Sequence, residues 1–304
     1  MKRFDGSNRL ILIVGSIYVL LYLCFYPRMY SSLDEDGYLS TAYLLKSGTI
    51  YYDVAGIPPD SMSVRMGEHV VSKHPPGNAL LMVPFLMVGP DWVFLRGLFL
   101  HLLGFVLVYG VLHRLQTPHA DFWALLYLAF PSFIVQSRTL LSDLPSATCV
   151  VGGLYFYLRG RWTAAGVWWG MAFLVRYPNL LVFLPFGIAA LGKAVRSQGW
   201  RPLWGAAMGF IPFGLAACMY NAFAYGHWTK VPEVSGSTGF SLTFVPGHLW
   251  FYLKSLLLIY PFMLLGPFFY RGPAKWEMRA SVLLMLGFNS AYYYLQEWGN
   301  PLEQ

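Results

Sequence analysis

The chain has 304 residues, of which 57% are hydrophobic and only 12% are charged, and its mean hydropathy is +0.49. Soluble domains carry about 25% charged residues, so this composition excludes an ordinary soluble protein and predicts an integral membrane protein. The apolar runs are long, continuous and rich in Leu, Phe and Trp, which predicts spanning helices rather than alternating barrel strands. The net charge of +7 lies mostly beside these runs, which favours lipid phosphates over nucleic acid as partners.

Nine apolar runs predict an all-α polytopic protein with about nine transmembrane helices in one domain, residues 1–304. The first run follows basic residues and lacks an Ala-x-Ala-like cleavage site, so we expect a retained anchor. With the N-terminus in the cytosol, the loops that stay inside carry Lys and Arg at every turn, as the positive-inside rule requires. The predicted spans are 10–26, 92–113, 122–137, 144–158, 162–175, 178–192, 202–222, 248–270 and 280–295.

Between the first two spans, residues 27–91 form a long extracytoplasmic loop in which we expect short juxtamembrane helices. Ser32 and Glu35 have the spacing of a capping box and predict a helix over 34–47. The apolar run 78–88 is too short to span and is flanked by prolines, which predicts an interfacial or re-entrant helix. A second outer segment, 223–247, is rich in Gly, Ser and Thr and predicts a loop.

Three consecutive acidic residues, Asp34 to Asp36, lie at the start of the predicted helix 34–47. One interpretation is that these carboxylates only complement the helix dipole. One or two acids suffice for that purpose, however, whereas three neighbouring carboxylates beside a bilayer repel one another. Such a group could supply a general base, for which Asp34 and Asp36 are the candidates. The same two carboxylates could instead provide oxygen ligands for a divalent cation.

Two further motifs lie on the same predicted outer face. Asp143 follows a tight turn between two spans, where it could cap the next helix or face the first acidic group as a second carboxylate. Lys73 and His74 precede a proline pair that stiffens this basic dipeptide, although a solvated loop is the simpler interpretation. Cations that end spans on this face commonly snorkel to headgroups, but together they also form a receptacle for a lipid-linked phosphate. These cations are Arg96, Arg138, Arg176 and Lys254.

The order of these motifs resembles the GT-C superfamily of polyprenyl-phosphate-dependent glycosyltransferases. The likeness is to bacterial members similar to protein O-mannosyltransferases and to the aminoarabinose transferases of lipid A. It rests on Asp34-Glu35-x-x-Tyr38 after the first span, Lys73-His74-Pro75-Pro76-Gly77, the acidic turn 138–145, and Tyr220-Asn221 with a following Gly226. His74 stands where the family usually has proline, and the third acid, Asp36, leaves the register of the catalytic carboxylate open.

The resemblance implies transfer of a sugar from a polyprenyl-phosphate donor to a glycan, lipid or protein acceptor on the extracytoplasmic side. It makes Asp34 the catalytic carboxylate, which would act as the general base. For such a reaction the candidates to bind the donor phosphate are the cations of the same face, Lys73, His74, Arg138, Arg176 and Lys254. It also implies residence in a bacterial inner membrane, and no certain cofactor beyond the possible cation. Family members are generally longer, so we expect this chain to be partial. The alternatives are a lipid or sugar transporter or flippase, which predicts ionisable groups at mid-membrane depth, and a noncatalytic assembly subunit.

Overall fold

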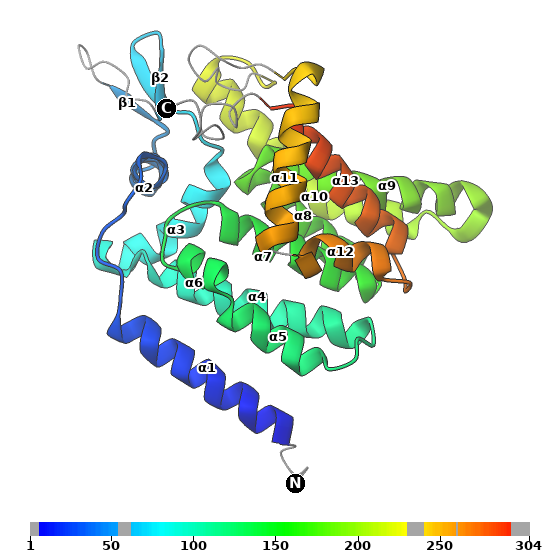
Figure 1. Cartoon of the computed structure of the whole chain (residues 1–304). Helices are drawn as coiled ribbons and strands as arrows, with labels where there is room; N and C mark the ends of the chain where they lie inside the picture. Colours follow the sequence, from blue (N-terminus) through cyan, green and yellow to red (C-terminus); the bar gives the residue numbers. More distant parts are fainter. Residues whose placement is uncertain (1–5, 54–61, 230–239, 260, 293–304) are drawn as a thin grey trace. The chain divides into compact units, whose positions relative to one another are not determined.

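The computed structural model describes residues 6–53, 62–229, 240–259 and 261–292 (Figure 1). Helices make up 76% of it, which confirms the predicted all-α class. The chain divides into two compact units. The first comprises Met1–Tyr177 and Trp204–Pro232, and the second comprises Pro178–Leu203 and Glu233–Gln304.

The first unit holds the N-terminal helices and most of α10. Its helices are α1 (Gly6–Cys24), α2 (Leu33–Lys46), α3 (Pro76–Val88), α4 (Leu95–Arg114), α5 (Ala120–Ala129), α6 (Pro131–Ser137), α7 (Asp143–Leu158), α8 (Trp162–Val175) and α10 (Arg201–Tyr225), with a 3-10 turn at Pro90–Trp92. Helix α7 packs against α4 and α8, while α3 contacts both α2 and α8. The approach of α4 to α6 is close enough to require glycine, because a Cβ at Gly97 would lie 1.8 Å from the carbonyl oxygen of Ser137.

The second unit is a smaller group of helices. It contains α9 (Leu180–Lys193) with a π-helical extension at Ala194–Gln198, then α11 (Val245–Ile259), α12 (Pro261–Phe269) and α13 (Lys275–Ser290). Helix α13 packs against α9, α11 and α12.

All nine predicted spans overlap helices, but two of them overlap two α-helices each. The predicted span 122–137 is split into α5 and α6 because Phe130, which precedes Pro131, is extended (φ −71°, ψ 125°), as a residue before proline prefers. The span 248–270 overlaps both α11 and α12, and residue 260 between them lies outside the described ranges. Pro212, by contrast, lies inside the single helix α10.

Three helical segments in the described chain are long and apolar enough to cross a membrane. They are Pro90–Arg114, Tyr177–Arg196 and Arg201–Tyr225. Shorter apolar helical stretches cover Arg9–Cys24, Pro76–Val88, Ala120–Ala129 and Trp162–Val175. The chain is therefore helical with candidate spans, and the full set of nine remains a prediction.

The loop 27–91 contains the two predicted helices, α2 and α3, and also a small sheet that the sequence interpretation missed. Strands β1 (Tyr51–Asp53), β2 (Ser63–Met66) and β3 (His69–Ser72) pair antiparallel in the order β1-β3-β2. Gly67, at φ +66°, lies in the turn between β2 and β3. The sheet packs on the end of α10, where Val71 joins Tyr220, Ala224 and Tyr225 in one apolar cluster. The loop is thus packed against α10, the helix that precedes the second outer segment.

The boundaries of that second outer segment also differ from the prediction of 223–247. Helix α10 continues to Tyr225, and α11 begins at Val245 after a 3-10 turn at Leu242–Phe244. The helical ends shorten the predicted loop on both sides, and its residues 230–239 lie outside the described ranges.

Candidate functional site

The start of α2 is a capping box, and its Glu35 also bonds to a distant turn. Ser32 is extended (φ −135°, ψ 154°), and its hydroxyl accepts the amide hydrogen of Glu35 at 3.3 Å. The Glu35 carboxylate returns to the amide of Ser31 at 3.2 Å and accepts from the hydroxyls of Ser31 and Ser32. Its other oxygen accepts the amide hydrogen of Leu140 at 2.8 Å, and only 1% of the residue is exposed. Glu35 therefore joins α2 to the turn before α7.

The two carboxylates beside Glu35 face different partners. The side chain of Asp34 is 54% exposed, and its Oδ1 lies 3.8 Å from Nε2 of His74. Asp36 instead lies close to Tyr30, and this carboxylate raises the pKa of the Tyr30 hydroxyl. Asp34 is consequently the carboxylate that lies next to the Lys73-His74 motif.

His74 is held between α2 and the end of β3. Its ring stacks on Tyr38 with centroids 4.1 Å apart and planes 26° from parallel. Gly37 makes room for this stack, because a Cβ there would lie 3.0 Å from the imidazole of His74. The Tyr38 hydroxyl donates to Oγ of Ser142 at 2.9 Å, and burial raises the pKa of Tyr38, so this hydroxyl remains a donor at neutral pH.

Ser142 is also hydrogen-bonded to an arginine. Its Oγ also accepts from Nε of Arg176 at 2.8 Å, and Nη1 of Arg176 donates to Oδ1 of Asp143 at 2.8 Å. The side chains of Arg176 and Asp143 are 46% and 41% exposed. A continuous set of contacts thus runs from a carboxylate on α2 to a guanidinium at the end of α8. We call it the α2–α8 cluster, made of Asp34, Tyr38, His74, Ser142, Asp143 and Arg176.

Buried polar side chains fix the turn that carries Ser142. Arg96 is 1% exposed and donates to the carbonyls of Thr139 and Leu141, at 3.2 and 3.4 Å, and to the side-chain oxygen of Asn78. Asn78 in turn donates to the carbonyl of Leu140 at 2.9 Å. Together with Glu35, these groups bind the backbone of residues 139–141 from α2, α3 and α4. Arg96, expected among the exposed outer cations, is therefore an internal support.

The remaining predicted cations occupy three different settings. Arg138 donates to the carbonyl of Phe25, and its guanidinium lies 5.7 Å from the ring centroid of Tyr22, so it contacts residues outside the α2–α8 cluster. Lys73 is next to His74, and its amide donates to the carbonyl of Met62 at 2.9 Å. Lys254 belongs to α11 of the second unit. Of the predicted phosphate ligands, the structure brings His74 and Arg176 together in the cluster.

The described residues contain no group of three or more His, Cys, Asp or Glu side chains arranged to hold a metal ion. Asp34 and Asp36 alone would supply two ligands, one of which is engaged by Tyr30. The possible divalent cation therefore gains no support from the described part of the chain.

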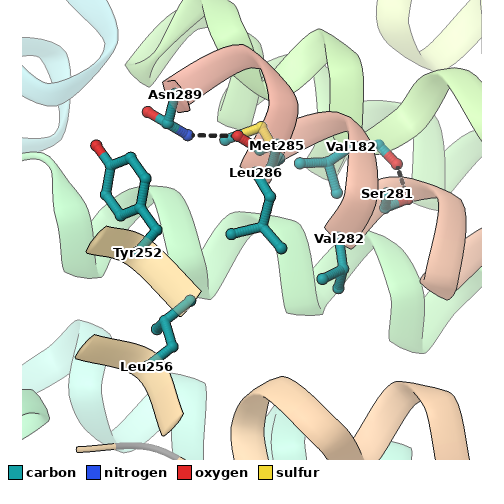
Figure 2. Close-up of a pocket in the computed structure, with 8 residues that line it drawn as sticks. All are labelled: Val182, Tyr252, Leu256, Ser281, Val282, Met285, Leu286 and Asn289. Atoms are coloured by element: carbon teal, nitrogen blue, oxygen red, sulfur yellow. Dashed lines mark hydrogen bonds between the residues drawn. The ribbon is translucent and has the colours of Figure 1, made fainter. Parts of the chain in front are cut away.

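A pocket of about 360 Å³ lies within the second unit, between α9, α11 and α13 (Figure 2). Two of its polar side chains are turned toward helix carbonyls: Ser281 donates to Val182 and Asn289 donates to Met285, both at 2.7 Å. The lining is completed by Tyr252, Leu256, Val282 and Leu286. Because no lining residue is charged, this pocket is a poor receptacle for a phosphate.

Most members of the α2–α8 cluster are residues that the sequence motifs singled out, but Ser142 was not among them, and Arg96 is buried rather than at the outer face. Ser142 immediately precedes Asp143, so the sequence indicates that it lies at the N-terminal end of a helix. The sequence does not indicate that Tyr38 and Arg176 donate to its hydroxyl. The sheet had a signal in the alternation of Ser63-Val64-Arg65-Met66 and in the turn residue Gly67. No known protein family, characterised protein or solved structure matches the chain.

Proposed function

We propose that the chain is an integral membrane glycosyltransferase of the GT-C type, which moves a sugar from a polyprenyl-phosphate donor to a hydroxyl or amine of a glycan, lipid or protein. The α2–α8 cluster carries the proposal. It links an exposed carboxylate, Asp34, to a half-exposed guanidinium, Arg176, through His74, Tyr38 and Ser142. A base for the acceptor and a cation for the leaving phosphate are the two groups that this reaction requires.

In the proposed reaction the acceptor oxygen or nitrogen attacks the anomeric carbon while its proton passes to Asp34. The bond from that carbon to the phosphate oxygen breaks, and the polyprenyl phosphate leaves with the electron pair. General-base assistance is worth about 10²- to 10⁴-fold in rate. The leaving phosphate needs neutralisation rather than protonation, and Arg176 with Lys73 and His74 supplies it. A single displacement of this kind inverts the anomeric carbon.

The proposal includes the predicted topology of nine spans with the N-terminus in the cytosol. In that topology α2, the sheet and the α2–α8 cluster lie at the extracytoplasmic face of a bacterial inner membrane, as the distribution of Lys and Arg in the loops favours. The cluster then meets the lipid-linked donor at the membrane interface, where charges interact more strongly than in water.

The test compares Asp34→Asn with Asp36→Asn in membranes that contain equal amounts of protein. Transfer from a radiolabelled polyprenyl-phosphate sugar is measured, together with the glycolipids of cells with and without the protein. We expect Asp34→Asn to lower transfer by about 100-fold or more, because it removes the base. Asp36→Asn is the matched control and should retain at least a third of the activity. Full activity in Asp34→Asn would refute the assignment.

A transporter or flippase is the second candidate, and one observation favours it. His101 is fully buried inside α4, where Nδ1 lies 2.7 Å from the hydroxyl of Tyr18. An ionisable group within a candidate span is a common feature of transport pathways. The two candidates separate in a reconstituted vesicle assay, since a flippase moves labelled lipid across the bilayer without any acceptor and a transferase does not.

A further inference from the structure

Two hydrogen bonds orient the Arg176 guanidinium, and they use only part of its hydrogen-bonding capacity. Its Nε donates to Ser142 and its Nη1 donates to Asp143, both at 2.8 Å, which uses two of the five N–H groups of the guanidinium. The side chain is 46% exposed. The rest of the planar fork can therefore bind a ligand at this surface while the two bonds keep its plane fixed.

Ser142 is the less obvious member of this arrangement. It is 1% exposed, and its hydroxyl oxygen accepts from both Tyr38 and Arg176. A hydroxyl oxygen offers two lone pairs, and both are directed to these donors. The orientation of Arg176 is thus tied, through Ser142, to the same helix α2 that carries Asp34.

We infer that Ser142 is a positioning residue that holds the guanidinium of Arg176 so that its open N–H edge receives the phosphate of a lipid-linked donor. The inference rests on the proposed function and adds to it the way in which the phosphate is aligned. Asp143 pairs with Arg176 on one side, and the guanidinium keeps its positive charge. A phosphate bound by the planar fork needs the N–H groups to point at its oxygens, and Ser142 supplies that direction.

The first experiment measures binding without any transfer step. A fluorescent polyprenyl monophosphate is titrated into the full chain in phosphatidylcholine nanodiscs, with the corresponding polyprenol as the uncharged probe. We expect Ser142→Ala to raise the Kd for the phosphate about threefold to tenfold, since a hydrogen bond to a charged group is lost, and to leave polyprenol binding unchanged. Ser142→Thr keeps the hydroxyl and should restore binding. Ser146→Ala is the matched control, a buried serine in the first turn of α7, the helix that Ser142 precedes.

Two competitors identify the source of the phosphate. Inorganic phosphate and nanodiscs doped with phosphatidic acid should each displace the probe weakly if the site takes a polyprenyl phosphate. Displacement by phosphatidic acid as efficient as by the unlabelled probe would overturn the inference in favour of a general headgroup site. Equal affinities of Ser142→Ala and Ser146→Ala for the phosphate would overturn it as well.

The second experiment separates this inference from the proposed function. If the protein is a transferase, Ser142→Ala should lower kcat/KM for the donor about tenfold and leave the KM for the acceptor unchanged, with recovery in Ser142→Thr. If the substitution only destabilised the protein, the kinetics toward both donor and acceptor would worsen, or less folded protein would be recovered. If Asp34→Asn does not reduce transfer, the proposed function is wrong. If Asp34→Asn abolishes transfer but Ser142→Ala leaves kcat/KM for the donor unchanged, only the positioning role of Ser142 is wrong.

Discussion

Replacement of Glu35 by glutamine should destabilise the fold far more than the same chemical change one residue later. Both oxygens of Glu35 act as acceptors, one from the amide of Leu140 at 2.8 Å and the other from the amide of Ser31 at 3.2 Å. An amide side chain presents only one oxygen, so its NH₂ group must face one of these two N–H donors. The carboxylate geometry therefore cannot be reproduced in either orientation of a glutamine.

The expected cost follows from burial. Loss of a hydrogen bond to a charged group costs about 1.5–3 kcal/mol, and the better orientation turns the NH₂ toward the more exposed Ser31, where water can compensate in part. We expect Glu35→Gln to lower the free energy of unfolding by about 2 kcal/mol. Asp36→Asn alters the contact with the exposed Tyr30 and should leave the unfolding curve nearly unchanged.

The assay is unfolding in mixed micelles with increasing SDS, followed by tryptophan fluorescence, with purified variants at matched concentration. Hydrogen exchange at the Leu140 amide gives a local measurement, and this amide should lose protection in Glu35→Gln. Equal unfolding curves for Glu35→Gln and Asp36→Asn, with the Leu140 amide still protected, would refute the structural role of Glu35.

Three further substitutions test the supports around the cluster. Gly77→Val should destabilise the chain by about 3 kcal/mol, because a Cβ there would lie 2.4 Å from the carbonyl carbon of Leu174, whereas Gly15→Val, with no atom within 4 Å, should be neutral in the same SDS titration. Arg96→Met should cost about 3 kcal/mol, since it leaves buried acceptors without their donor, and an unchanged midpoint would count against the support. Tyr225→Phe removes a 2.8 Å hydrogen bond to a β3 carbonyl and should cost about 1 kcal/mol, with faster hydrogen exchange confined to the sheet.

Local signals in the sequence predicted the helices well. The spacing of Ser32 and Glu35 identified the start of α2, and the prolines before residue 78 identified the start of α3. A residue before proline avoids helical geometry, which is why the predicted span 122–137 breaks at Phe130. Hydropathy located the helical segments because a run of apolar residues is a property of consecutive positions.

Contacts between distant residues were beyond such signals. Glu35 and Leu140 are 105 positions apart, and nothing near either residue indicates that the carboxylate accepts that amide. Arg96 shows the same limit, since an arginine at the end of an apolar run normally reaches headgroups. Here Asn78 and two carbonyls of the turn provide enough acceptors for the guanidinium to stay buried.

The register of the hairpin decides which side chain faces Asp34. Val71 of β3 is paired with Tyr51 on one side and Val64 on the other, and the chain reaches the stack on Tyr38 only three residues later. A slip of one position would bring Lys73 to the place of His74 and exchange a flat ring for a flexible ammonium group. Extra residues should therefore be tolerated at the Gly67 turn, at the far end of the hairpin, and not between Ser72 and the proline pair.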